Sequence, residues 1–160
     1  MRKHLVTVVM CIFVFSVLGL AQAKKSSKKS TSSSSIPDKA YLQKIWDGWS
    51  TLDPANVAQF YAKGDHTFFD IAPLKYNNWD EYEAGVKKEL ADYKSAKFTV
   101  NDDARLYRAG EYVWSNSTVK ADMTTKADKR DLSNFRWTVV FEKQQGNWLI
   151  VHEHVSIPMQ

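Results

Sequence analysis

The chain has 160 residues, 44 % of them hydrophobic, and a formal net charge of +4. Of the 22 basic residues, two lie near the N-terminus and four in a Lys/Ser-rich stretch, which leaves 16 against 18 acidic residues from Ile36 onward. This length is typical of one domain, and the absence of a basic stripe argues against binding to nucleic acid.

The N-terminus has the pattern of an export signal. Arg2 and Lys3 precede an apolar run from Leu5 to Leu20, and Ala21-Gln22-Ala23 follows with small residues at the cleavage positions. The run is shorter than the roughly 20 residues of a membrane span. We therefore expect residues 1–23 to be a cleaved signal peptide, with no stable membrane insertion afterwards and a secreted or periplasmic product.

A polar stretch, KKSSKKSTSSSS, covers residues 24–35. It is too polar to pack, so we expect a disordered tether, followed by one folded domain over residues 36–160. The only cysteine, Cys11, lies in the apolar run of the predicted signal. The exported chain would then fold without a disulfide or a reactive thiol.

Helical signals dominate the beginning of the domain. Pro37-Asp38 starts a helix in which one face carries Tyr41, Leu42, Ile45, Trp46 and Trp49. Asp53-Pro54 has the form of an N-cap followed by a first-turn proline, which predicts a short helix that ends near Gly64.

A strand and a second long helix follow. The segment Thr67–Ile71 is rich in aromatic and β-branched residues, which predicts a strand, and a loop is expected over residues 72–77. Asn78 with Glu81 three residues later resembles a helix cap. The helix after it should bury four residues at helical spacing: Tyr82, Val86, Leu90 and Tyr93.

From about Lys97 the pattern changes to strands. Candidate strands cover residues 98–108, 111–122, 132–143 and 147–157, with turn signals between them. The order of helices, strand, helix and four strands predicts an α+β fold. We expect a cone-shaped, curved antiparallel β-sheet with the helices packed on its concave face.

Two segments resemble a known family. DPANVAQFYAKGDHTFFDIAPLKY and FRWTVVFEKQQGNWLIVHEHVSIP are similar to the SnoaL-like, ketosteroid-isomerase-related branch of the nuclear transport factor 2-like superfamily. The resemblance implies a cone-shaped pocket for a small, mainly apolar organic molecule, a homodimer, and no cofactor. It does not settle the activity, because this fold hosts isomerases, dehydratases, cyclases, hydrolases and non-catalytic assembly modules.

Two carboxylates are the catalytic candidates. The segment that ends in Asp70 resembles the family segment that ends in the general base, and an apolar pocket wall would raise the pKa of this carboxyl toward a useful value. The alternative is that Asp70 caps the following loop. Glu153, in the last strand, would be the second carboxylate.

The resemblance also has departures. Ile45 or Trp46 stands where the isomerase has its oxyanion-holding tyrosine, and Trp137 or Thr138 stands where it has a second aspartate. The loss of each such hydrogen-bond donor lowers the catalytic rate about a hundredfold or more, so we do not expect steroid isomerisation. Candidate ligand-binding residues that the pattern places in the pocket are Trp46, Trp49, Tyr61, Trp137, Val139, Val151 and Val155.

The closing hairpin carries a polar cluster. Strict alternation along the last strand puts His152, His154 and Ser156 on one face with Trp148 and Ile150, and a three-residue turn would place Thr138 opposite His152 and Arg136 opposite His154. Because Arg136 repels cations, we expect a structural or interface role for Arg136, Thr138, His152, His154 and Ser156, and no metal site.

Overall fold

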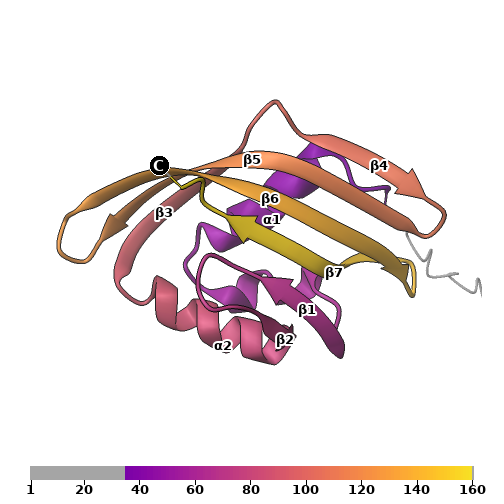
Figure 1. The fold of residues 1–160 in the computed structure, drawn as a ribbon, viewed down its shortest axis with the longest axis horizontal. Coiled ribbons are helices and arrows are strands. Elements are labelled where there is room, and N and C mark those ends of the chain that lie inside the picture. The colour runs from indigo at the N-terminus through magenta and orange to yellow at the C-terminus, as the bar shows by residue number, and fades with distance from the viewer. Residues whose placement is uncertain (1–34, 160) are drawn as a thin grey trace, which may run out of the picture. The chain divides into compact units, whose positions relative to one another are not determined.

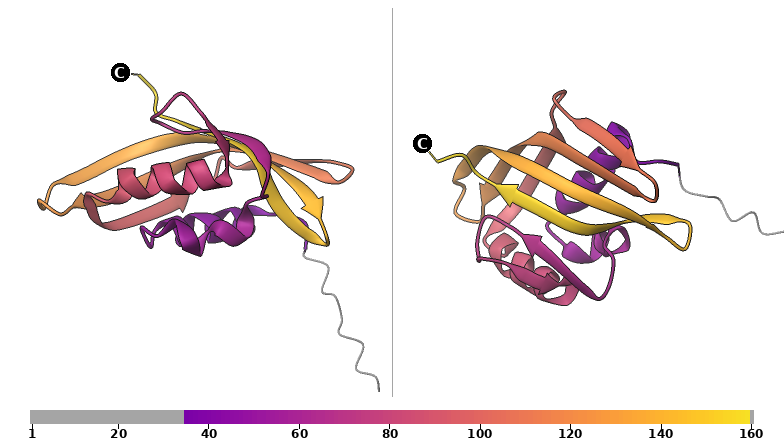
Figure 2. Two further views of the ribbon diagram at one scale, coloured as in Figure 1. Left: turned by 90° about the horizontal axis from the view of Figure 1, so that it is seen from below. Right: turned by 45° about the vertical axis from the view of Figure 1, so that its right-hand side comes forward.

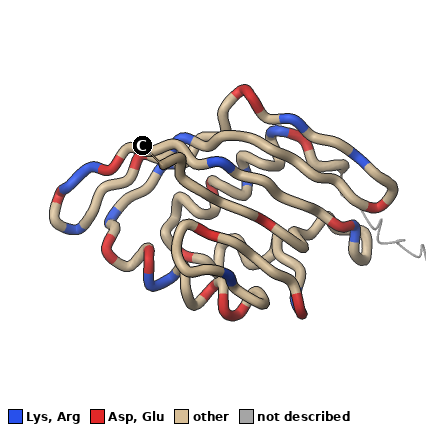
Figure 3. The backbone as a smooth tube through the Cα atoms, viewed as in Figure 1, with Lys and Arg blue, Asp and Glu red and all other residues tan. Residues whose placement is uncertain are grey.

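The structure is a computed structural model that describes residues 35–159. The predicted signal peptide and all but the last residue of the predicted tether lie outside the described residues. Within the described range, no helix is long and apolar enough to cross a membrane. Charged residues of both signs are interspersed along the chain (Figure 3).

Residues 35–159 form two α-helices, two short 3-10 helices and seven strands (Figure 1). In chain order these are α1 (Lys39–Trp49), η1 (Pro54–Asn56), η2 (Ala58–Phe60), β1 (Asp65–Phe69), β2 (Tyr76–Asn78), α2 (Trp79–Leu90), β3 (Tyr93–Val100), β4 (Arg105–Ala109), β5 (Tyr112–Thr125), β6 (Arg130–Gln144) and β7 (Asn147–Ser156).

All seven strands belong to one curved sheet, in the order β2-β1-β7-β6-β5-β3, with β4 paired to the other end of β5. The α+β cone that the sequence predicts is confirmed, and both helices lie under the concave face (Figure 2). The sheet is mixed, however, because β1 runs parallel to β7. The predicted strand over residues 98–108 is two strands, since the chain turns between Val100 and Arg105, where Asp103 accepts hydrogen bonds from Thr118.

The helices begin where their caps predict. The Asp38 carboxylate accepts a hydrogen bond from the Tyr41 amide at 2.8 Å, and the Asn78 side chain accepts one from the Glu81 amide at 2.9 Å. Each cap satisfies an amide that has no partner inside its helix. The apolar face of α1 then packs into the cone through Leu42, Ile45, Trp46 and Trp49.

A β-bulge in β7 corrects the predicted faces of the closing hairpin. Gln145 and Gly146 have φ of +50° and +87° and form a two-residue turn, not a three-residue one. Farther along, Val140 pairs with His152 and Phe141 with Ile150, so Val151 is the extra residue.

The bulge reverses the alternation of side chains, so the uniform face that strict alternation predicts is wrong. Trp148 and Ile150 are buried on the concave face together with Glu153 and Val155, and not with the histidines. The predicted pairs are wrong as well, because Thr138 lies opposite His154 and Arg136 opposite Ser156.

One glycine permits close packing of α2 against β2. A Cβ atom added at Gly85 would lie 2.2 Å from the Tyr76 hydroxyl oxygen and 2.3 Å from a carbon of its ring. Tyr76 is buried, so the ring has little room to move away. The bare backbone of Gly85 therefore lets the helix approach the edge of the sheet.

We expect Gly85→Ala to lower the free energy of unfolding by about 1–3 kcal/mol, because overpacking outweighs the gain in helix propensity. Urea denaturation measures the change. The exposed Lys87→Ala on the same helix is the control and should stay within about 0.5 kcal/mol of the wild type. An alanine variant as stable as the wild type would show that the Tyr76 ring moves freely.

Candidate functional site

A cavity of about 380 Å³ lies between the helices and the concave face of the sheet. Its walls come from α1, α2, β3, β5, β6 and β7 and from the segments after β1 and β7. The lining residues are Trp46, Trp49, Asp70, Ile71, Tyr82, Val86, Glu89, Leu90, Tyr93, Phe98, Met123, Asp131, Ser133, Phe135, Val155 and Ile157. This volume and largely apolar lining are typical of a site for a small organic molecule.

Asp70 lies in the cavity wall, directly after β1. Its carboxylate accepts a hydrogen bond of 2.7 Å from the backbone amide of Ile71, and the amides of Ala72 and Leu74 are not its partners. The side chain is partly buried and lines the same cavity as Trp46 and Trp49. Asp70 therefore lines the cavity, and its carboxylate oxygens have lone pairs that can accept a proton.

Burial raises the pKa of Asp70 from its ordinary value of 3.8 to about 7. The Ile71 amide opposes this shift, because it favours the charged form, while the nearby charges of Glu153 and Glu89 add to it. A carboxyl with a pKa near neutrality can both accept and release a proton under ordinary conditions.

Glu153 has a different environment. It is only 1 % exposed, and it does not line the cavity. The Tyr61 hydroxyl donates to its Oε1 at 2.9 Å, the Tyr82 hydroxyl donates to the same atom, and Trp137 Nε1 donates to Oε2 at 3.0 Å. The Trp49 indole donates in turn to the Tyr61 hydroxyl at 3.2 Å.

These donors offset part of the penalty for burying a carboxylate. Desolvation nevertheless raises the pKa of Glu153, while the bonds from Tyr82, Trp137 and Tyr61 lower it. Desolvation also raises the pKa of Tyr61 and of Tyr82 well above the ordinary value, so both hydroxyls stay protonated and able to donate. Glu153 is thus one hydrogen bond away from the cavity, through Tyr82.

The predicted ligand-binding residues divide into two groups. Trp46, Trp49 and Val155 line the cavity. Tyr61 and Trp137 are held by Glu153, Val139 is buried opposite Glu153, and Val151 is the half-buried bulge residue; these four do not line it.

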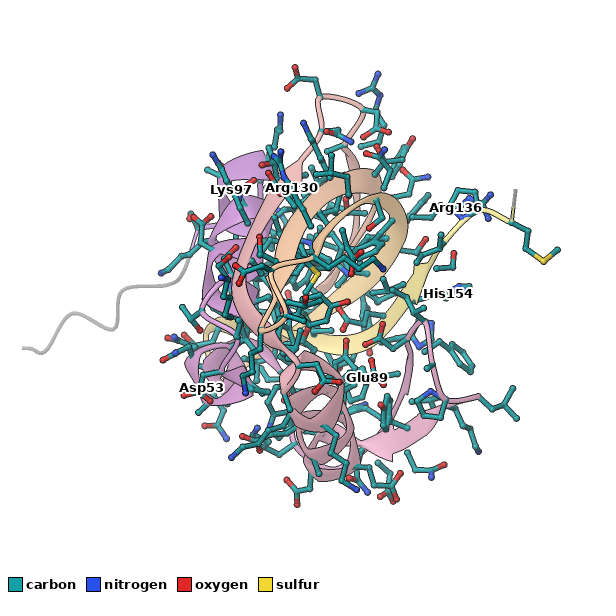
Figure 4. The ribbon with its side chains drawn as sticks, turned by 90° about the vertical axis from the view of Figure 1, so that its left-hand side faces the viewer. Asp53, Glu89, Lys97, Arg130, Arg136 and His154 are labelled. Atoms are coloured by element: carbon teal, nitrogen blue, oxygen red, sulfur yellow. The ribbon has the colours of Figure 1, made fainter. Side chains whose placement is uncertain are left out.

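The predicted polar cluster lies on the convex face of the sheet. Arg136, Thr138 and His154 are exposed, and Figure 4 shows Arg136 and His154 on the side of the sheet away from α1. His152 Nδ1 lies 2.7 Å from the carbonyl oxygen of Thr67, which ties β7 to β1. Within residues 35–159, no three His, Cys, Asp or Glu side chains are placed to hold a metal ion.

Several cavity residues do not appear among the sequence candidates. Tyr82 is predicted only as a buried helix residue, although its hydroxyl joins the cavity to Glu153. Glu89 and Asp131 also line the cavity, and Figure 4 shows Glu89 on α2. Glu89 lies three residues after Val86 on α2, which is the signal that could have indicated it, because residues three or four apart share a face. Tyr93, which the sequence places on this helix, is the first residue of β3.

The fold and the cavity define a nuclear transport factor 2-like protein. The profile of the SnoaL-like domain matches residues 39–160, so the chain belongs to the SnoaL-like family. No curated protein sequence matches the chain significantly.

Solved structures share this fold at low sequence identity. A nuclear transport factor 2-like superfamily protein from Salmonella enterica is similar with a TM-score of 0.66 and 14 % identity, over 76 % of this chain and 92 % of that one. A ketosteroid isomerase-like protein from Erwinia carotovora gives 0.64 and 12 %, over 76 % and 93 %. A candidate scytalone dehydratase from Novosphingobium aromaticivorans gives 0.65 and 10 %, over 74 % and 79 %.

The raised pKa of Asp70 predicts a pH-dependent cost to stability. The Asp70 carboxyl ionises near its ordinary pKa of 3.8 in the unfolded chain and near 7 in the folded chain. The stability that its neutral form contributes is therefore fully present below about pH 4 and is lost as the pH rises to 7. Asp70→Asn should remove a penalty of up to about 4 kcal/mol, and the variant should melt at least about 5 °C above the wild type at pH 8.

Thermal unfolding followed by circular dichroism at about pH 4 and pH 8 measures this difference. The gain at pH 8 should shrink or vanish at pH 4. Asp47→Asn, on the exposed face of α1, is the matched control and should show no such pH-dependent gain. An equal effect of Asp70→Asn at both pH values would contradict the burial of this charge.

Proposed function

We propose that this SnoaL-like protein is exported and binds a small, mainly apolar organic molecule in the cavity. Asp70 transfers a proton to or from the bound molecule, as in an isomerase, dehydratase or cyclase. The export signal, Arg2 to Ala23, supports a secreted or periplasmic location.

One observation carries the catalytic part of this proposal. Asp70 lies in a cavity walled by Trp46, Trp49 and Phe135, and its pKa is about 7 because burial disfavours the charge. A base that abstracts a proton from carbon needs an accessible oxygen, a raised pKa and a site that excludes water. Asp70 lines the cavity and has a raised pKa, and the wall around it is mainly apolar. Two of the structurally similar proteins are a ketosteroid isomerase-like protein and a candidate scytalone dehydratase.

Glu153 has a supporting role in this proposal. Its two oxygens already accept three hydrogen bonds, and Tyr82 separates it from the cavity. It holds Tyr82 and Trp137 in place, and its charge contributes to the raised pKa of Asp70. Asp70 alone is therefore the proposed proton acceptor.

Deprotonation of a nitrobenzisoxazole tests this function without knowledge of the natural substrate. The base takes the ring C–H proton, the N–O bond breaks, and a coloured cyanophenolate forms. We expect turnover above the buffer rate with an inflection near pH 7, and a loss of at least about a hundredfold in Asp70→Asn.

The exposed Glu111→Gln is the control and should keep wild-type activity. Asp70→Asn should still bind 2-naphthol, a neutral aromatic probe, because the substitution preserves the shape of the cavity. If Asp70→Asn retains full activity, the base is elsewhere. If the wild type binds 2-naphthol but shows no turnover, the domain binds without this chemistry.

A non-catalytic dimerisation or accessory module is the second candidate. Its support is the convex face, where Tyr107 and Trp114 are 46 % and 40 % exposed and stack at 4.2 Å between ring centroids. Large exposed aromatic residues on a sheet face are typical of an interface, and dimers are the commonest closed assemblies. The proposed homodimer would bury this face together with Arg136 and His154.

His154→Glu and Trp114→Glu should each weaken this dimer, because they place an acidic group in its interface. Sedimentation equilibrium of the purified protein measures the change. Lys87→Glu on α2 is the control and should leave the dimer intact. A monomeric wild type, or a dimer that neither substitution weakens, would refute this interface.

A further inference from the structure

The charge of the cavity wall is one-sided. Three carboxylates line it, Asp70, Glu89 and Asp131, and none of the lining residues is a lysine, arginine or histidine within the described part of the chain. The Lys129 ammonium contacts Asp131 at 3.1 Å, but its side chain is 76 % exposed, so it neutralises only the rim. The cavity wall therefore carries acidic groups that no basic lining residue balances.

The apolar part of the wall is mainly aromatic. The rings that line it belong to Trp46, Trp49, Tyr82, Tyr93, Phe98 and Phe135. The face of an aromatic ring attracts cations, most strongly when water is excluded. Carboxylates and aromatic rings around one cavity are the groups that recognise organic ammonium ions.

Trp46 adds an unsatisfied hydrogen-bond donor to a residue of the cavity wall. It is 6 % exposed and lines the cavity, and its indole Nε1 has no hydrogen-bond acceptor among the described residues. A buried donor without a partner is rare in folded proteins. The nitrogen itself is enclosed, so an acceptor atom on a bound molecule would reach it only if the indole ring turned toward the cavity.

The acidic groups also destabilise one another. The groups that act on Asp70 are Glu153 from β7, Glu89 and the Tyr82 hydroxyl from α2, and the Ile71 amide. Glu153 and Glu89 both disfavour the negative charge of Asp70. Desolvation raises the pKa of Glu89 as well. A cation between Asp70 and Glu89 would relieve this repulsion and favour both carboxylates.

We propose that the cavity selects an organic cation, an amine or quaternary ammonium compound with an apolar or aromatic body, whose charged head lies between Asp70 and Glu89. The body of the ligand packs against Trp46, Trp49 and Phe135. This inference rests on the proposed ligand-binding function and adds the charge of the ligand to it.

Two probes of equal shape, one charged and one neutral, distinguish the effect of ligand charge on affinity from the effect of apolar packing. Phenyltrimethylammonium and tert-butylbenzene differ only in the central atom of the head group, and the cation keeps its charge at every pH. Titrations of the purified protein are followed by the indole N–H signals of Trp46 and Trp49 in NMR spectra. Trp114, on the convex face, is an internal reference that should not shift.

At about pH 8 the cation should bind at least about tenfold more tightly than tert-butylbenzene. This preference should decline toward about pH 5.5, because Asp70 takes up a proton. Asp70→Asn and Glu89→Gln should each reduce the preference several-fold and leave the affinity for tert-butylbenzene unchanged. Glu111→Gln, outside the cavity, should change neither affinity.

Each contrary outcome of these titrations contradicts a different part of the proposal. Equal affinity for both probes, or tighter binding of tert-butylbenzene, would overturn the charge inference and leave the proposed apolar pocket standing. A preference for the cation that survives Asp70→Asn and Glu89→Gln would overturn the assigned head-group position. If neither probe moves the Trp46 and Trp49 signals, both this inference and the proposed ligand binding fail.

Discussion

The fold depends on one buried carboxylate. Glu153 lies on the concave face of β7, and its three donors come from the segment after η2, from α2 and from β6. A carboxylate without donors would be expensive to bury, so these segments have to meet at one point for the domain to fold. The Trp49 bond to Tyr61 extends the same network to α1. One acidic side chain thus links α2 directly to the sheet, and α1 indirectly through Tyr61 and Trp49.

The two central carboxylates show how surroundings divide chemical roles. Glu153 is fully satisfied and enclosed, whereas Asp70 has one backbone donor and an open side toward the cavity. Their charges act on each other, since Glu153 disfavours ionisation of Asp70. The residue with more hydrogen bonds is the stable support, and the residue with fewer is available for binding and proton transfer.

The sequence was sufficient for the α+β cone and the helix caps, but not for the parallel pairing of β1 with β7 or for β2, which overlaps the end of the predicted loop over residues 72–77. Asp38 and Asn78 are local signals, and their hydrogen bonds depend on only a few neighbouring residues. The faces of β7 were not predictable from alternation, because one extra residue, Val151, shifts every side chain beyond it to the other face. The full set of donors to Glu153 and the carboxylates Glu89 and Asp131 depend on long-range packing that no local pattern encodes.

The parallel pairing of β1 with β7 also sets the order of events during synthesis. Phe68 pairs with Glu153, although 84 residues separate them along the chain. Ribosomes deliver the chain from its N-terminus, so β1 must wait for almost the whole domain before its central partner exists. Until then Phe68 lacks its pairing partner on β7, and the hydroxyls of Tyr61 and Tyr82 lack their acceptor, Glu153. The sheet is therefore completed only when β7, the last strand in the described part of the chain, takes its place between β1 and β6.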